Sequence, residues 1–488
     1  MKQMRMMCLS LLLCFTLAAC TAAPAAGNDT ETKPEPSAEP AETSGQSGNE
    51  TAGTITEDDI DITETLESAA DGEHVITADG ETISVSNTAV NKSGDSEGDE
   101  ADFYGENSAV FAQNGGTLNL SGMIITTGGT HANAVFSYGE GTTVTIRDSV
   151  IKTSGNCSGG IMTTGGGVMN AENLNIHTTG NSSAAIRSDR GGGVVTVTGG
   201  SYTTDGTGSP VIYSTADITV NDAVLTSTAS QGVVVEGRNS VTLNNSDLTA
   251  DNNTKNSDKS DWYQAVMIYQ SMSGDAAEGL SSFTMNGGSL TNQNGDIFFV
   301  NNTATTITLN GVSITNNDET GVFLRAAAAG WGNEGSNGGQ VTLTASNQKI
   351  TGDILADSVS SVNLILKEGS SLSGAVNPDG TEGEVYVELD GSSKWVLTAD
   401  SYITSLTCEE GAIDLNGHTL YVDGTAYEGG ASTGEAIVVK AVASGQGEGR
   451  PEGKPDESHG TPPEGKPGER PEGNSGMADK EPPAKPEN

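Results

Sequence analysis

Apolar residues recur through the middle of the chain in a fixed arrangement. Two apolar residues stand two positions apart, a polar pair follows, and a further apolar residue comes five positions after the second one. This five-residue step occurs in eight units, namely Leu120/Ile125, Ile146/Ile151, Ala171/Ile176, Val197/Tyr202, Val220/Leu225, Leu243/Leu248, Met285/Leu290 and Leu309/Ile314. The second members are 26, 25, 26, 23, 23, 42 and 24 residues apart. Alternation indicates strands, and a period of 23–26 residues is typical of one solenoid coil, with an insertion where the spacing is 42.

The polar pair inside each unit predicts a sharp corner between two strands. It is rich in residues that tolerate left-handed backbone angles, as at Gly199-Gly200, Asn244-Asn245 and Asn310-Gly311. Asparagines that recur at one corner are also expected to hydrogen-bond along the stack. Residues 100–345 show no apolar stripe with a period of 3.6, so we expect no helix there.

A third apolar segment follows each unit. We place its middle residue inward, which gives Val135, Ile161, Ile186, Ile212, Val235, Ile268, Phe299 and Leu324. The next residue then points outward, and these residues form one column: Phe136, Met162, Arg187, Tyr213, Glu236, Tyr269, Val300 and Arg325. Stacked strands lie about 4.8 Å apart. Arg187, Tyr213, Glu236 and Tyr269 are therefore expected on four successive coils, with Arg325 two coils beyond.

The pattern predicts an all-β chain whose folded body is a single-stranded parallel β-helix, a type of solenoid. Residues 57–345 form the regular coils, with loop insertions at 250–280 and 326–340, and residues 346–443 form a less regular end or cap. Within this body only Pro210 and Pro378 occur, as expected for strands paired by backbone hydrogen bonds.

The two ends differ from the body. Residues 1–20 have a basic start, an apolar run and a final Leu17-Ala18-Ala19-Cys20, which resembles the lipobox of bacterial lipoproteins. The resemblance implies a signal peptide and lipidation of Cys20, which would anchor the chain to the membrane. Residues 21–56 are predicted to be a disordered tether, and residues 444–488, with nine of the 15 prolines, a disordered tail rich in Pro, Gly, Glu and Lys.

The later coils resemble a known family. The strands Trp395 to Ser401 and Gly411 to Gly424 are similar to the last rungs of pertactin-like autotransporter passengers. Residues 100–430 as a whole resemble right-handed β-helix proteins of bacterial surfaces, including adhesins, polysaccharide-binding lipoproteins and, more distantly, pectate-lyase-like enzymes. The right-handed coil is implied by this resemblance alone.

The net charge and the cysteine positions exclude several kinds of partner and site. The formal net charge of −43 repels nucleic acid and anionic headgroups, so DNA and RNA are excluded as partners, and any membrane contact is expected through the lipid anchor only. Cys157 and Cys408 fall too many coils apart for a disulfide and are read as unpaired. Without a CxxC or a Cys/His cluster in the sequence we expect no zinc site and no cofactor, and whether calcium binds stays open.

The candidate binding residues are the outward column and two loop tryptophans. Tyrosines stack on sugar rings, and arginine and glutamate hydrogen-bond hydroxyls or uronate carboxylates. We therefore select Arg187, Tyr213, Glu236, Tyr269, Arg325, Trp262 and Trp331. Alternatively, the column is an ordinary exposed strand face and each tryptophan pins its own loop. A further column, Thr126, Lys152, His177, Thr203, Thr226, Thr249, Thr291 and Thr315, is read as a structural ladder.

The expected function is that of a lipid-anchored protein on the extracellular face of the bacterial cell membrane, which binds a polysaccharide or a host or cell-surface glycan, or acts as an adhesin. Catalytic residues are not assigned, because the sequence shows no cluster of acidic residues on neighbouring coils. Two alternatives remain: a polysaccharide lyase or hydrolase of the pectate-lyase-like class, and a structural surface stalk.

Overall fold

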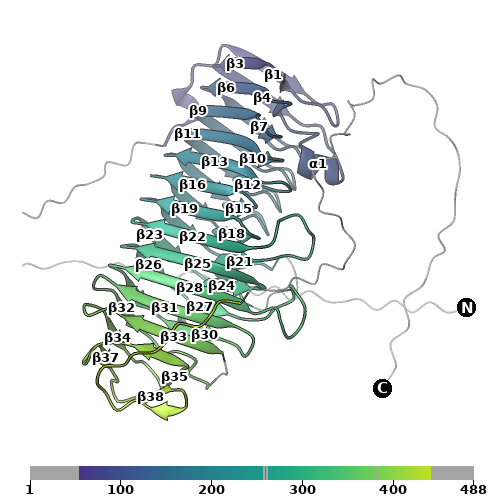
Figure 1. Ribbon diagram of the computed structural model, residues 1–488. Coiled ribbons are helices and arrows are strands. Elements are labelled where there is room, and N and C mark those ends of the chain that lie inside the picture. The colour runs from purple at the N-terminus through teal and green to yellow at the C-terminus, as the bar shows by residue number, and fades with distance from the viewer. Residues whose placement is uncertain (1–53, 256–258, 260–261, 381–382, 441–488) are drawn as a thin grey trace, which may run out of the picture. The chain divides into compact units, whose positions relative to one another are not determined.

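The computed structural model describes residues 54–255, 259, 262–380 and 383–440. Cys20, the tether and the tail therefore lie outside the described residues, apart from positions 54–56. The chain forms a parallel β-helix in which each regular coil contributes three strands, one to each of three faces (Figure 1). A short 3₁₀ helix, η1 (Glu57–Asp59), precedes the first coil, and one α-helix, α1 (Asp99–Tyr104), lies outside the coils.

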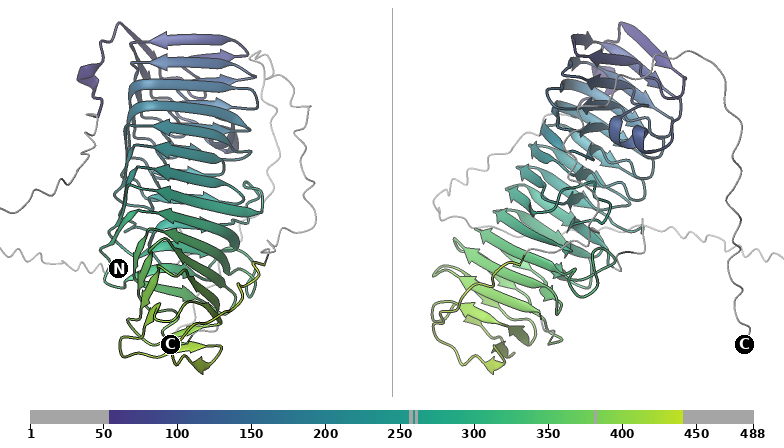
Figure 2. Two further views of the ribbon diagram at one scale, coloured as in Figure 1. Left: turned by 60° about the vertical axis from the view of Figure 1, so that its left-hand side comes forward. Right: turned by 45° about the vertical axis from the view of Figure 1, so that its right-hand side comes forward.

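The first face runs the length of the coil stack. Its strands are β3 (Thr82–Ser86), β6 (Thr117–Ser121), β9 (Thr143–Thr153), β11 (Gly167–Thr178), β13 (Gly193–Thr198), β16 (Asp217–Asn221), β19 (Ser240–Asn244), β22 (Leu280–Asn286), β25 (Thr303–Asn310), β28 (Gly339–Ser346), β31 (Ser361–Lys367), β33 (Glu384–Leu389) and β36 (Ser405–Thr407). Each pairs in parallel with the next, so coils continue beyond residue 345 (Figure 2).

The second face follows the corner. The long strands β9 and β11 continue round the corner onto it. Its other strands are β1 (Glu64–Ser68), β4 (Thr88–Lys92), β7 (Ile124–Thr127), β14 (Ser201–Thr204), β17 (Val224–Ser227), β20 (Asp247–Ala250), β23 (Ser289–Asn292) and β26 (Ser313–Asn316), then a separate sheet of β29 (Lys349–Thr351), β32 (Ser371–Ser373), β34 (Lys394–Val396) and β37 (Ile413–Asp414).

The third face carries the predicted site. Its strands are β2 (Ile76–Asp79), β5 (Val110–Gln113), β8 (Val135–Tyr138), β10 (Ile161–Thr164), β12 (Ile186–Ser188), β15 (Ile212–Ser214), β18 (Val233–Glu236), β21 (Gln264–Tyr269), β24 (Asp296–Asn301), β27 (Val322–Ala326) and β30 (Asp353–Ala356). A last sheet of β35 (Ser401–Ile403), β38 (Leu420–Val422) and β39 (Thr425–Ala426) ends in an antiparallel pair.

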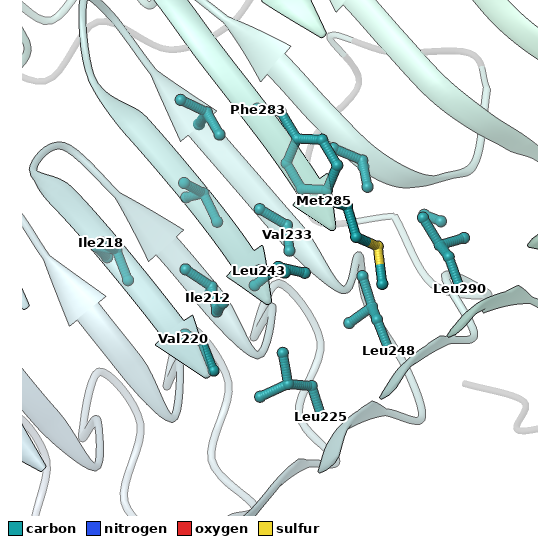
Figure 3. Packing of buried hydrophobic residues seen from close by; sticks show 14 of the residues in the cluster. Ile212, Ile218, Val220, Leu225, Val233, Leu243, Leu248, Phe283, Met285 and Leu290 are labelled. Atoms are coloured by element: carbon teal, nitrogen blue, oxygen red, sulfur yellow. The ribbon is translucent and has the colours of Figure 1, made fainter. Parts of the chain in front are cut away.

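The core lies between the three faces and consists of stacked aliphatic side chains. Figure 3 shows Val220 and Leu243 of the first face, Leu225 and Leu248 of the second, and Ile212 of the third, all within one cluster. The five-residue step predicted these positions, and the strand register confirms it, because Leu225 pairs with Leu248 and Val220 with Leu243. The 42-residue spacing is likewise an insertion within one coil, since Leu248 pairs with Leu290.

The predicted corners are also confirmed. The second corner residue is left-handed, with φ of 53° at Asp222 and 47° at Asn245. The first corner residue is an asparagine in four successive coils. The side-chain amide of the first, Asn221, donates to the backbone oxygen of Val197 at 3.1 Å, and the other three each donate to the side-chain oxygen of the asparagine in the coil before. These bonds run from Asn244 to Asn221 and from Asn286 to Asn244, both at 2.8 Å, and from Asn310 to Asn286.

The structure corrects three expectations. Helix α1 falls inside residues 100–345, where no helix was expected; at six residues it is too short to produce an apolar stripe. The insertion predicted at 250–280 is two loops, 251–263 and 270–279, with β21 between them. The third strand of each coil departs from the expected register in β18, β21 and β24, as described next.

Candidate ligand-binding site

After β15 the outward column of the third face departs from the predicted one by two residues in β18 and β21 and by one residue in β24, and it meets the predicted residue again at Arg325 in β27. Tyr213 pairs with Val234, which pairs with Met267, then Phe299 and Arg325. Glu236 and Tyr269 pair with each other two positions further along the same strands. Phe299, predicted inward, points outward, and Val300, predicted outward, is in the core. Val235 faces inward as expected but pairs with Ser214, so it does not share a file with Ile212.

The register was misread because these strands are apolar on both sides. Val233-Val234-Val235 and Ile297-Phe298-Phe299-Val300 are buried throughout. Their outward side chains are covered by the neighbouring loops, so apolar and polar positions no longer alternate, and alternation is the only signal that separates one face from the other.

Two elements cover the outer side of the third face. At its N-terminal end α1 lies over the coils that carry Phe111, Phe136 and Met162 (Figure 1). Phe136 and Met162 point outward as predicted, yet both are fully buried. Further along, Trp262 and residues of the loop 327–338 cover a second cluster. We call this second group the aromatic cluster; it contains Tyr213, Val234, Trp262, Met267, Tyr269, Phe299, Ala327, Ala329 and Trp331.

Both loop tryptophans belong to the aromatic cluster. Trp262 packs on Phe299 at 5.4 Å between ring centroids, and the guanidinium of Arg325 lies 4.6 Å from the centre of the Trp262 ring. Trp331 meets Tyr269 edge to face at 5.0 Å. The tryptophans thus do hold their loops to the coils, and both also remain partly exposed. The sequence placed them beside the coils of Tyr269 and Arg325, and the structure confirms that proximity.

A hydrogen-bond network lies beneath the tryptophans. Tyr213 and Tyr269 both donate to Oε2 of Glu236, with 3.0 Å from the Tyr269 hydroxyl, and the two hydroxyls are 3.4 Å apart. Burial, reinforced by the Glu236 charge, raises the pKa of both tyrosines well above the ordinary value. Tyr269 adds to the shift at Tyr213, whereas the hydrogen bond with Tyr213 acts in the opposite direction on the pKa of Tyr269. Glu236 is 2% exposed, and its Oε1 has no hydrogen-bond partner among the described residues.

The two predicted arginines are held by carboxylates. Arg325 makes a two-point contact with Asp296, at 2.6 and 3.3 Å. Arg187 donates to Asp189 at 3.0 Å and lies 3.8 Å from Asp102 of α1. Burial raises the pKa of the Asp189 carboxyl to about 6, although Arg187 acts in the opposite direction. Neither guanidinium is fully exposed, so both residues mainly organise the face.

A cavity of about 120 Å³ opens beside the aromatic cluster. Four of the seven predicted residues line it, Tyr213, Tyr269, Trp262 and Trp331, whereas Arg187, Glu236 and Arg325 do not. Sequence reasoning missed a set of polar and aromatic lining residues, which are Gln231, Asn252, Thr254, Lys255, Tyr263 and Gln264. The run Trp262-Tyr263-Gln264 was an available signal, since its three residues all line the cavity. Gln264 is 1% exposed and its amide oxygen has no hydrogen-bond partner among the described residues.

The remaining predictions fall elsewhere. The threonine column is confirmed as one continuous ladder on the second face, from Thr126 through Lys152 and His177 to Thr315. Cys157 and Cys408 are both free thiols, as expected. Among the residues that the structure describes, no helix has the length and apolar character needed to cross a membrane.

Comparison with known proteins does not identify a family for this chain. No family model matches the chain, and no curated protein and no solved structure matches it significantly.

Proposed function

We propose that this protein is a cell-surface lipoprotein that binds glycans through the cavity beside the aromatic cluster, and so acts as an adhesin or polysaccharide receptor. The observation that carries the proposal is the lining of the cavity. Tyr213, Trp262, Tyr263, Tyr269 and Trp331 supply ring surfaces, and Gln231, Asn252, Thr254 and Gln264 supply amides and a hydroxyl. Aromatic faces with a few convergent polar groups suit a ligand that has both C–H faces and many hydroxyls, as sugars do.

The size of the cavity limits what enters it. Sites that enclose drug-sized ligands usually have volumes of roughly 300–1,000 Å³, and this cavity has about 120 Å³. A single sugar residue, terminal or on a side branch, is the part of a glycan that fits best. The unpaired amide oxygen of Gln264 supplies an acceptor for one of its hydroxyls.

Binding is favoured over catalysis by the state of the buried groups. A tyrosine that acts as a base needs a lowered pKa, and the pKa values of Tyr213 and Tyr269 are shifted in the opposite direction, so neither hydroxyl is activated as a base. Glu236 is enclosed by the same two hydroxyls and does not line the cavity. These residues therefore serve to fix the shape of the wall.

The lipid anchor and the extracellular location are part of this proposal and rest on the sequence around Cys20. Anchoring at that end would present the coils, and with them the cavity, to molecules outside the membrane.

A glycan array probed with the purified protein tests the function, with and without EDTA. Retention of a defined set of glycans without any released product supports the proposal. Release of unsaturated oligosaccharides would replace it with the lyase alternative. If no class of glycan is retained, the structural stalk becomes the better interpretation.

A further inference from the structure

Three side chains with metal-ligating atoms meet beside α1, away from the aromatic cluster. They are Asp102, His131 and Cys157, and one ligand atom from each lies within 4.8 Å of the others. Nδ1 of His131 is 2.8 Å from Oδ1 of Asp102. No Cys/His cluster was expected from the sequence, because these residues are far apart along the chain. We propose that Asp102, His131 and Cys157 form a binding site for a zinc-like divalent metal ion.

The coil geometry brings His131 and Cys157 together. Both occupy the same position of a turn that repeats in successive coils, where the backbone N–H donates to the next coil. His131 donates to Asn156 at 2.9 Å, and Cys157 to Asn181 at 2.8 Å. Both have left-handed backbones, with φ of 56° and 54°. Side chains in the same conformation on adjacent coils project side by side, about 4.8 Å apart.

Helix α1 supplies the third group. Ala101 of this helix is fully buried. The side chain of the next residue, Asp102, reaches the ring of His131, with 2.8 Å between Oδ1 and Nδ1. The side chains of His131 and Asp102 are 13% and 24% exposed, and Cys157 is partly buried. The cluster is thus sheltered but open on one side, which is the arrangement of a site with three protein ligands and one further position for water or a ligand.

The donor set selects the kind of metal. Thiolate, imidazole and carboxylate are together the ligands of zinc and of neighbouring transition metals. Calcium and magnesium prefer sites made of oxygen atoms. The proposed ion is therefore not the calcium that the sequence analysis left open.

The surrounding charges are compatible with a divalent ion. Arg187 lies 3.8 Å from Asp102 but is paired with Asp189 at 3.0 Å, so these two charges offset one another. Asp102 and a thiolate at Cys157 then carry two negative charges, which a divalent cation neutralises. Arg187 is placed as an outer partner that orients the Asp102 carboxylate, as groups around metal ligands commonly do.

The test is titration of the purified full-length chain with Co²⁺ and Zn²⁺. A cobalt ion bound by a thiolate gives a charge-transfer absorption that cobalt bound by oxygen and nitrogen lacks. The variants are Cys157→Ser and His131→Asn. Serine already occupies the equivalent turn position in the next coil, at Ser182 with φ of 55°, and asparagine tolerates this conformation, so both variants are expected to fold. Cys408→Ser is the matched control, because Cys408 is also a free thiol.

We expect one Zn²⁺ per chain, the thiolate absorption with Co²⁺, and loss of that absorption in Cys157→Ser but not in Cys408→Ser. Zn²⁺ affinity should fall by more than about 100-fold in Cys157→Ser and His131→Asn, since even partners outside the ligand set contribute 10–100-fold. Binding that is unchanged in both variants, or cobalt without the thiolate absorption, would overturn the proposal. So would Zn²⁺ binding that Cys408→Ser abolishes.

Discussion

Tyr269 donates a hydrogen bond to Glu236 across two adjacent coils, with 3.0 Å between its hydroxyl oxygen and Oε2, and the two residues are direct partners in the strand register. Tyr213 donates to the same oxygen from the coil before. One carboxylate thus joins three successive coils at the floor of the aromatic cluster.

Removal of this carboxylate is expected to cost more than removal of either hydroxyl. Glu236→Ala leaves two buried hydroxyls without their acceptor, at about 1–3 kcal/mol each. Tyr269→Phe removes one hydrogen bond and should cost only about 1 kcal/mol. Thermal and urea unfolding of the two variants and the wild type measure the difference. Equal stability of Glu236→Ala and Tyr269→Phe would contradict the role given to Glu236.

The same network predicts a loss of stability at alkaline pH. The folded state holds the pKa of Tyr213 and Tyr269 well above their unfolded value of about 10. Below pH 10 both states keep the protons; above it the unfolded chain loses them first, so the free energy of unfolding falls as the pH rises. Unfolding midpoints between pH 8 and 11 measure the slope. The double variant Tyr213→Phe/Tyr269→Phe should show a shallower decline, and an unchanged slope would speak against buried, protonated hydroxyls.

Glycan binding should depend on the rings that line the cavity. Tyr213→Ala and Trp262→Ala each remove a stacking surface worth about 1–2 kcal/mol, and about 1.4 kcal/mol is one decade of affinity. Affinity for a glycan identified on the array should therefore fall roughly ten-fold in each variant, measured by calorimetry. Because Trp262 also covers Phe299 and Arg325, a melting curve must accompany this variant.

Thr226→Ala is the control for these two variants, since Thr226 lies in the ladder of the second face. It should bind normally. If Thr226→Ala loses affinity while Tyr213→Ala and Trp262→Ala retain it, the threonine ladder is the binding face and the cavity is not.

Damage to the core should spread to neighbouring coils. Ile212 is fully buried and pairs with Ile186 on one side and Val233 on the other. Ile212→Asp buries an unpaired carboxylate, at a cost of roughly several kcal/mol. Hydrogen exchange should show lost protection strongest in β12, β15 and β18, because each coil contacts mainly its neighbours. Uniform loss along the whole stack would indicate that the coils unfold as one unit.

The anchor is tested by fractionation of cells. With acyl chains at Cys20 the protein should partition into the detergent phase, and Cys20→Ala should move it to the soluble fraction or the medium. The same partitioning for both proteins would mean that Leu17 to Cys20 is not a lipobox.

The first two strands of each coil could be predicted from the sequence because one side of each strand is buried in the core and the other side faces solvent. Leu225 and Thr226 alternate in burial, and so do Leu248 and Thr249, which fixes the register. The corners could be predicted for a similar reason, since Asn245 and Gly287 occupy a left-handed position that few other residues adopt readily.

The candidate site could be predicted only in part. Arg187 and Tyr213 lie where alternation still operates, whereas Glu236 and Tyr269 are the last residues of strands that are buried on both sides. Gln264 could have been found only through its place directly after Trp262 and Tyr263, since a lone glutamine at the start of a strand is not a sign of a binding site. His131 and Cys157 did leave a signal: they are separated by the 26 residues that also separate the turn partners Ala132 and Ser158. Asp102 left none, since only the packing of α1 brings it there.

The asparagine ladder has a consequence for how such a chain can change over time. The bond from Asn244 to Asn221 spans 23 residues and that from Asn286 to Asn244 spans 42, yet both measure 2.8 Å. The extra residues lie between β20 and β21 and between β21 and β22, and the asparagine corner between the first and second faces keeps the same geometry. Length can therefore be added or removed at 251–263 without resetting the rest of the molecule. Variation in specificity between related chains should then concentrate in these loops, while the corner asparagines remain.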